Sequence, residues 1–195
     1  MMTYRGIIAN PSLKNAFRLF HDGVLNPILM AILDLQITDA PVLRQKATPV
    51  RKIDAELLQL IEDMFDTMYN VQGIGLAAPQ VGVSQRIIIV DIEDAHPECP
   101  PIALINPIII TASGEALAEE GCLSLPERRG IVRRATTVHV TGVLPNGAAI
   151  AFEANDLMAR VLQHEIDHLN GILFIDRLLP EDQALLESQI EPVRR

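Results

Sequence analysis

Five consecutive residues, His164 to His168, give the strongest chemical signal in the chain. They read H-E-I-D-H and lie in a stretch whose apolar residues recur at helical spacing. Residues four apart in a helix share one face, so both imidazoles can reach a single metal ion. Glu165 then lies beside the histidine pair, where its carboxylate can take a proton from a metal-bound water. A chance match is disfavoured because a histidine in a mostly apolar helix needs polar partners.

The two histidines need a third ligand, since catalytic zinc-type sites usually take three from the protein. No histidine follows His168, but carboxylates do: Asp176, Glu181, Asp182, Glu187 and Glu191. The other source is Cys122, upstream in E-G-C-L-S. An isolated cysteine is usually a small buried hydrophobe. We expect Cys99, in a proline-rich loop, to be one, and both sources of a third ligand stay open.

A glycine-rich stretch spans residues 72–82 and reads Q-G-I-G-L-A-A-P-Q-V-G. Its glycines imitate a dinucleotide-binding fingerprint, but they follow a predicted helix rather than a strand, and Pro79 disfavours a helix start. The better interpretation is a loop in which backbone approaches a ligand. The amide of Gln80 could then stabilise an oxyanion, although a polar residue in an ordinary turn is the simpler alternative.

Composition limits the class of protein. The chain has 195 residues, 49% of them hydrophobic and 21% charged, which predicts one globular domain of ordinary type. A net charge of −9 argues against stable DNA binding, and two cysteines are too few for a disulfide framework. No apolar run is long enough for a membrane span.

The elements that must position these residues form an α+β pattern. Helices are predicted at 54–71, with Asp54 as N-cap, and at 155–170, where the HExxH helix ends near Gly171 and is apolar almost all round. Strands are predicted at 86–92 and 102–111, the second an edge strand or two pieces because of Pro107. A hairpin is predicted around residues 145–147, and a short helix from Pro180.

The first 29 residues differ from the rest. They carry a net charge of +2, against −9 for the whole chain, so residues 30–195 carry −11. Leu13, Phe17 and Phe20 recur at helical spacing beside basic residues. An upstream start codon, with Met30 as the functional start, is the favoured interpretation. A targeting segment and a plain surface helix are the alternatives.

Three segments together resemble the peptide deformylase family: G-I-G-L-A-A-P-Q at 73–80, E-G-C-L-S at 120–124 and Q-H-E-I-D-H at 163–168. They occur in the family's order, and the likeness runs from about Met30 to about Pro180. It implies small mixed or antiparallel sheets wrapped around a central HExxH helix, with residues 30–195 as the catalytic domain. It also implies a metal-dependent hydrolase that removes the formyl group from the N-terminal formylmethionine of new polypeptides and releases formate.

The resemblance implies a role for each site residue. Cys122, His164 and His168 would hold one divalent ion, Fe²⁺ in the cell, for which Zn²⁺, Ni²⁺ or Co²⁺ can substitute. Glu165 would be the general acid and base, and Gln80 with the backbone N–H of Leu123 would form the oxyanion hole. The residues implied in substrate binding are Ile74, Gly75, Arg129, Leu157 and Val161.

The implied partners are N-formylmethionyl nascent peptides and the ribosome near its exit, in a bacterial cytoplasm. An organelle is the alternative compartment if residues 1–29 are a transit segment. Two other functions compete. A metalloprotease would take its third ligand downstream of His168 and would give Cys122 no role. A regulatory metal-binding module would have a closed site with four ligands and a dispensable Glu165.

Overall fold

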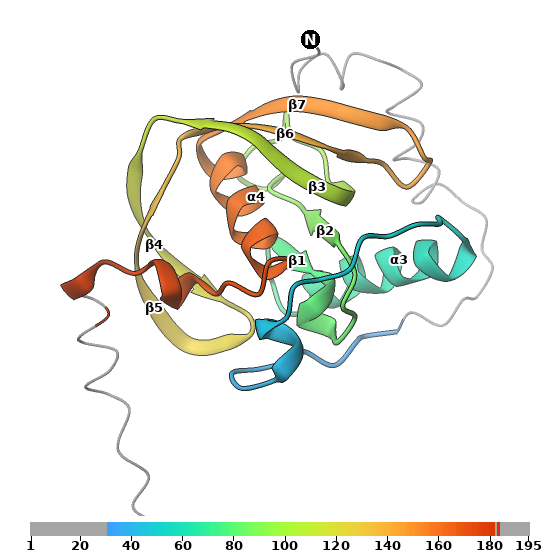
Figure 1. The fold of residues 1–195 in the computed structure, drawn as a ribbon, viewed down its shortest axis with the longest axis horizontal. Helices are drawn as coiled ribbons and strands as arrows, with labels where there is room; N and C mark the ends of the chain where they lie inside the picture. The colour runs from blue at the N-terminus through green and yellow to red at the C-terminus, as the bar shows by residue number, and fades with distance from the viewer. Residues whose placement is uncertain (1–30, 182, 184–195) are drawn as a thin grey trace, which may run out of the picture.

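Two antiparallel sheets surround one central helix in the computed structural model, which describes residues 31–181 and 183 (Figure 1). The larger sheet has the strand order β1-β2-β3-β6-β7, and the smaller one is a β4–β5 hairpin. The strands are β1 Gly75–Ala77, β2 Ile87–Val90, β3 Ile102–Ser113, β4 Ala116–Cys122, β5 Leu125–Arg134, β6 Thr137–Val143 and β7 Ala149–Asn155. This arrangement confirms the predicted α+β fold.

The central helix is α4, Asp156–His168, which carries the HExxH residues. It packs against β1, β2, β3, β6 and β7, and most of its residues are buried. Asn155 is its N-cap, which agrees with the predicted start at residue 155. The helix ends at His168, two residues before the predicted end at residue 170. Gly171 has a φ of 73° and donates its N–H to the carbonyl of His168, so glycine suits the turn that follows the helix.

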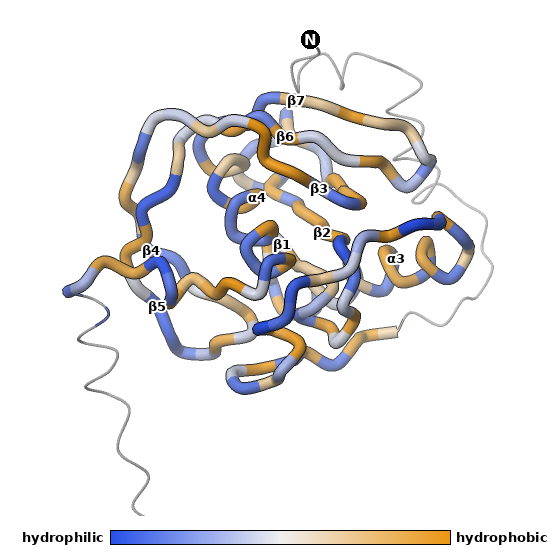
Figure 2. The backbone as a smooth tube through the Cα atoms, viewed as in Figure 1, coloured by the Kyte–Doolittle hydropathy of each residue, from blue (hydrophilic) through white to orange (hydrophobic). Residues whose placement is uncertain are grey.

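The strand β2 is buried on both faces, which explains its continuous apolar run (Figure 2). Ile88 and Val90 belong to the core cluster that includes α4 residues. Ile87 and Ile89 belong to a second cluster with α3, Ala55–Asn70, on the opposite face of the sheet. Because alternate side chains of a strand point to opposite faces, the run supplies both cores. The sheet is thereby fixed between two helices.

The start of α3 agrees with the sequence prediction. Asp54 is its N-cap, and one carboxylate oxygen accepts the N–H of Leu57 at 3.1 Å. Short 3₁₀ helices complete the described chain: η1 Pro41–Arg44, η2 Ala78–Val81 and η3 Phe174–Arg177. A helix begins at Pro180, as expected, within the last described residues. No helix in residues 31–181 and 183 is long and apolar enough to cross a membrane.

The prediction of an edge strand or two pieces at residues 102–111 was wrong, because β3 is one strand that continues through Pro107 and pairs with both β2 and β6. The pairing of β2 with β3 ends at Ile105, and the register of β3 against β6 shifts between Ile105 and Ile108. Pro107 falls within this bulge, where its missing N–H costs no ladder hydrogen bond. The expected helix at Leu13, Phe17 and Phe20 lies outside the described residues.

Candidate active site

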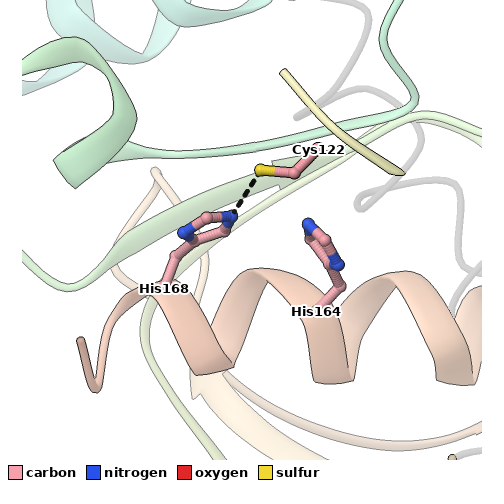
Figure 3. Close-up of side chains that lie close together, drawn as sticks. All are labelled: Cys122, His164 and His168. Carbon is pink, nitrogen blue, oxygen red and sulfur yellow. Dashed lines mark hydrogen bonds between the residues drawn. The ribbon is translucent and has the colours of Figure 1, made fainter. Parts of the chain in front are cut away.

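Cys122, His164 and His168 come together from two elements, β4 and α4 (Figure 3). One potential ligand atom from each residue lies within 4.8 Å of the others. The sulfur of Cys122 is 3.2 Å from Nε2 of His168. The two imidazoles rise from successive turns of α4 on the side that faces Cys122, with ring centroids 5.0 Å apart. The described residues therefore bring the cysteine, rather than a downstream carboxylate, to the histidine pair.

The downstream carboxylate Asp176 is engaged elsewhere. It pairs with Arg44 and accepts the backbone N–H of Leu173 at 2.8 Å. Cys99 packs against the central core, as expected for a small hydrophobe, and burial raises the pKa of its thiol. These positions leave Cys122 as the partner of the two histidines in the described chain.

The hairpin that carries Cys122 ends in a very tight turn. Cys122 and Leu125 are Cα partners, and the register shifts between Gly121 and Cys122. Ser124, in the turn, is fully buried, and its carbonyl accepts the N–H of Thr38 at 2.8 Å. The turn is thus fixed from outside the hairpin, and it holds the sulfur over α4.

The donor set fits a divalent cation. Burial alone would lower the pKa of His164, but hydrogen bonds with Cys122 and Glu120 raise it to about 10. Negative groups around this ring therefore favour a positive charge at the site. Burial lowers the pKa of His168 well below its usual value, which keeps that imidazole neutral, as metal ligation requires. One thiolate and two imidazoles suit Fe²⁺ or Zn²⁺ better than Mg²⁺ or Ca²⁺.

Glu165 lies beside this cluster in an apolar setting. Its side chain is buried, and Oε2 has no hydrogen-bond partner among the described residues. Burial raises the pKa of Glu165 to about 7, in the range useful for moving protons near neutral pH. Gly75 approaches so closely that a Cβ atom there would lie 2.5 Å from Oε1 of Glu165. A glycine at this position therefore leaves room for the carboxylate.

Gln80 is fixed at both ends of its amide. Its Oε1 accepts the backbone N–H of Ala77 at 2.8 Å, and its Nε2 donates to Oγ of Ser124 at 3.3 Å. Nε2 also lies 3.6 Å from the sulfur of Cys122. The amide therefore presents its N–H groups to the cysteine side of the cluster. Leu123 directly follows Cys122 in the turn.

The residues expected to bind substrate occupy different environments. Ile74 is 47% exposed, and Val161 of α4 is buried close to Gly75. Leu157, one turn earlier on α4, packs against the central core. Arg129 extends from β5 into solvent and pairs with Glu119 at 3.2 Å. Gly75, Val161 and Glu165 thus form one contact group, while Leu157 and Arg129 are not part of it.

Sequence reasoning gave no role to Glu120, Ser124, Arg134 or Asp167, all of which are buried. Oε2 of Glu120 lies 3.0 Å from Nδ1 of His164. Glu120 stands two residues before Cys122, and residues two apart in a strand share a face, but this relation becomes usable only once β4 is known to be a strand. Nothing in the sequence marked Arg134, because its partner lies across a hairpin that was not predicted.

An HExxH helix with a nearby cysteine, and with a buried glutamate whose Oε2 has no hydrogen-bond partner among the described residues, defines a class, the metal-dependent hydrolases. Comparison with known proteins narrows it. The family model described as "Polypeptide deformylase" matches residues 32–184. Peptide deformylase 1 of Clostridium acetobutylicum is 49% identical over 149 residues, 76% of this chain and 96% of that protein. The peptide deformylase of Syntrophobacter fumaroxidans is 51% identical over 151 residues, 77% of this chain and 89% of that protein.

Solved structures agree. A peptide deformylase from Legionella pneumophila superposes with a TM-score of 0.75 at 42% identity, covering 82% of this chain and 93% of that one. The enzyme from Thermotoga maritima gives a TM-score of 0.73 at 42% identity, covering 77% and 99%. The chain belongs to the peptide deformylase family. Its reaction is the metal-dependent hydrolysis that removes the formyl group from the N-terminus of nascent polypeptides.

Proposed function

We propose that Cys122, His164 and His168 bind the ion on which this deformylase activity depends, and that the ion is Fe²⁺ in the cell. The proposal is supported by the mutual approach of their ligand atoms within 4.8 Å. A thiolate beside two imidazoles also accommodates Zn²⁺, Ni²⁺ or Co²⁺. A divalent ion at this place supplies an acidic water molecule and a Lewis acid for the formyl carbonyl.

Glu165 is proposed to move the protons. Its carboxylate takes one proton from the attacking water as the new bond to the formyl carbon forms. It then gives a proton to the departing amine as the C–N bond breaks, so that formate and a free N-terminus leave. The burial of Glu165, the unpartnered Oε2 and a pKa of about 7 support this role.

Gln80 and the backbone N–H of Leu123 are proposed to stabilise the oxyanion. In the tetrahedral transition state, negative charge develops on the former formyl oxygen, and fixed donors are worth most there. The two hydrogen bonds that orient the Gln80 amide support this assignment, because they preorganise its N–H groups. Leu123 is supported by its place next to Cys122 in the tight turn.

The peptide is proposed to run along Gly75, with the methionine side chain between Ile74 and the Leu157–Val161 stripe of α4, and with Arg129 near the peptide backbone. Close packing of Gly75 against Val161 and the exposure of Ile74 support the first part. A peptide deformylase from Acinetobacter baumannii, 37% identical with a TM-score of 0.72, is described with Met-Ala-Ser bound. That relative supports methionine at the N-terminus of the substrate.

We also propose residues 30–195 as the catalytic domain, acting in the cytoplasm beside the ribosomal exit. The match to the family model begins at residue 32, which supports this boundary. Deleting residues 1–29 should leave both the deformylation rate and Tm almost unchanged, because every residue proposed for the site lies between Ile74 and His168. A Tm loss of several degrees would instead show that the segment packs on the domain.

The observation that best supports these assignments is the position of Cys122 beside the two histidines of the HExxH helix. The test is formate release from formyl-Met-Ala-Ser by protein purified without oxygen and loaded with Fe²⁺. We expect release at one formate per free amine, and loss of release after His164→Ala. Cleavage of internal peptide bonds instead would favour the metalloprotease alternative. Full activity in the His164→Ala variant would refute the proposed ligand set.

A further inference from the structure

A cluster of charged side chains, buried at its centre, lies behind the proposed metal ligands, between the β4–β5 hairpin and α4. We call it the Arg134 cluster; its members are Glu120, Arg134, Arg160, Asp167 and Arg177. At its centre Arg134 is 4% exposed, and its Nε and Nη2 each donate to one oxygen of Glu120 at 3.0 Å. Its Nη1 donates to Asp167 of α4. Arg134 therefore joins a hairpin carboxylate to the helix that bears both histidines.

Glu120, held in place by Arg134, in turn contacts the ring of His164. Its Oε2, which Arg134 already contacts, lies 3.0 Å from Nδ1 of His164. A carboxylate at that distance accepts a hydrogen bond from Nδ1–H, so Nε2 is the ring nitrogen through which His164 would bind a metal ion. The orientation of the Glu120 carboxylate thus determines the orientation of the imidazole ring.

His168 has no equivalent support. Its Nδ1 is buried and has no hydrogen-bond partner among the described residues. The two histidines of the HExxH sequence therefore differ: a carboxylate holds Nδ1 of His164, whereas no described residue holds Nδ1 of His168. A change in the Arg134 cluster should act on one ligand and leave the other in place.

We propose that Arg134 is a positioning residue that acts through Glu120 to orient the His164 ring toward the metal. The inference rests on the metal site proposed above. Arg160 also contacts Glu120, at 2.7 Å, but through one nitrogen, and it gives its other bonds to the carbonyls of Val132 and Ala116. Arg160 lies on α4 and so also ties Glu120 to the helix, but it contacts one oxygen of the carboxylate. Arg134 donates to both oxygens, and therefore fixes the plane of the carboxylate as well as its position.

Loss of Arg134 should leave a folded protein. Glu120 keeps Arg160, and Asp167 keeps Arg177, whose Nη2 donates to Oδ1 at 2.6 Å. Each buried carboxylate therefore retains one guanidinium, and no uncompensated negative charge results. The substitution then changes the orientation of Glu120 more than it changes the charge balance.

The experiment measures Co²⁺ binding, by chelator competition and by the visible absorption spectrum, in wild type and in Arg134→Met and Arg134→Lys. Arg133→Gln is the matched control, because Arg133 immediately precedes Arg134 on β5. Its side chain is exposed and pairs with the exposed Glu115 at 3.0 Å. We expect the Co²⁺ Kd to rise about 10- to 100-fold in both Arg134 variants, with shifted absorption bands. The control should match wild type.

A double-mutant cycle with Glu120→Gln separates positioning from general destabilisation. If Arg134 acts through Glu120, the Arg134→Met/Glu120→Gln protein binds Co²⁺ about as weakly as the weaker single variant. Losses that multiply would overturn the proposal, as would a folded Arg134→Met protein with wild-type Kd and spectrum. If Arg134→Met fails to fold, Arg134→Lys decides by the same criteria. Unfolding of both variants would overturn the positioning role.

Failure of the metal site itself gives a different result. Wild-type protein that does not take up one Co²⁺ per chain would refute the proposed ligand set before any variant is compared. Wild-type protein that binds Co²⁺ while the Arg134 variants bind it equally well would refute only the role of Arg134.

Discussion

Replacing Gln80 with methionine tests the proposed oxyanion hole most directly. Methionine is of similar length and apolar, so it fills the buried site but offers no N–H to the developing oxyanion. It also removes Oε1, which accepts the N–H of Ala77 at 2.8 Å. One substitution therefore has two separable consequences, one for the reaction and one for the stability of the fold.

Both consequences can be given a size. Loss of one preorganised oxyanion donor lowers kcat by about 10²- to 10³-fold, or about 2.7–4 kcal/mol. KM should change little, because the interaction belongs to the transition state. The unpaired, buried N–H of Ala77 should cost about 1–3 kcal/mol of folding free energy. In a chain of this size, each kcal/mol lowers Tm by about 2–4 °C.

Ser124→Ala is the matched control, because it removes the Oγ that orients the Gln80 amide but leaves the amide itself. Losing one orienting hydrogen bond worth about 0.5–1.5 kcal/mol should slow the reaction only about 2- to 13-fold. Metal content, Tm and steady-state formate release are measured on the same preparations. A metal-replete, folded Gln80→Met protein with kcat within about threefold of wild type would refute this reasoning.

The remaining predictions concern the other proposed roles. Glu165→Gln should keep its metal and fold, while kcat falls by about 10²- to 10⁴-fold because the proton acceptor is gone. Metal analysis paired with kinetics checks this, and a metal-free variant would make Glu165 a ligand instead. Cys122→Ala should lose the ion and the activity, whereas Cys99→Ala, which changes only core packing, should lose neither. Metal content per chain decides, and a normal value in Cys122→Ala would remove the cysteine from the ligand set.

The helical half of the site could be predicted because its geometry is local. His164, Glu165 and His168 lie within five residues of one helix, and helical periodicity alone sets their relative directions. The run at 86–92 predicted a buried strand because it is rich in β-branched residues, and β2 forms at Ile87–Val90 within it. In both segments the neighbours in sequence are also the neighbours in space.

The hairpin half could not be predicted, because β4 lacks the signals that sequence reasoning uses. Its residues, A-L-A-E-E-G-C, show no regular apolar alternation, and Leu117 is 52% exposed. The buried side chain of this strand is the charged Glu120, held by Arg134 fourteen residues away. A buried ion pair has no periodicity, and its partner is known only once the strand register is known.

The placement of the proposed ligands on two separate elements, α4 and the β4–β5 hairpin, predicts how the protein responds to removal of its metal. Two proposed ligands lie on α4, inside the main core, and the third lies at the tip of a separate two-stranded sheet. An ion bound to all three links the hairpin to the helix, so opening of the hairpin must break the bond to Cys122. A free ion concentration of 100 times Kd stabilises the bound state by about 2.7 kcal/mol. Here this free energy should mainly oppose opening of the hairpin. Backbone amides of β4 and β5 should therefore exchange with deuterium faster in the apo protein, while those of β2 and β3 change little. Equal acceleration in all four strands would show that the ion stabilises the domain as a whole and would contradict this account.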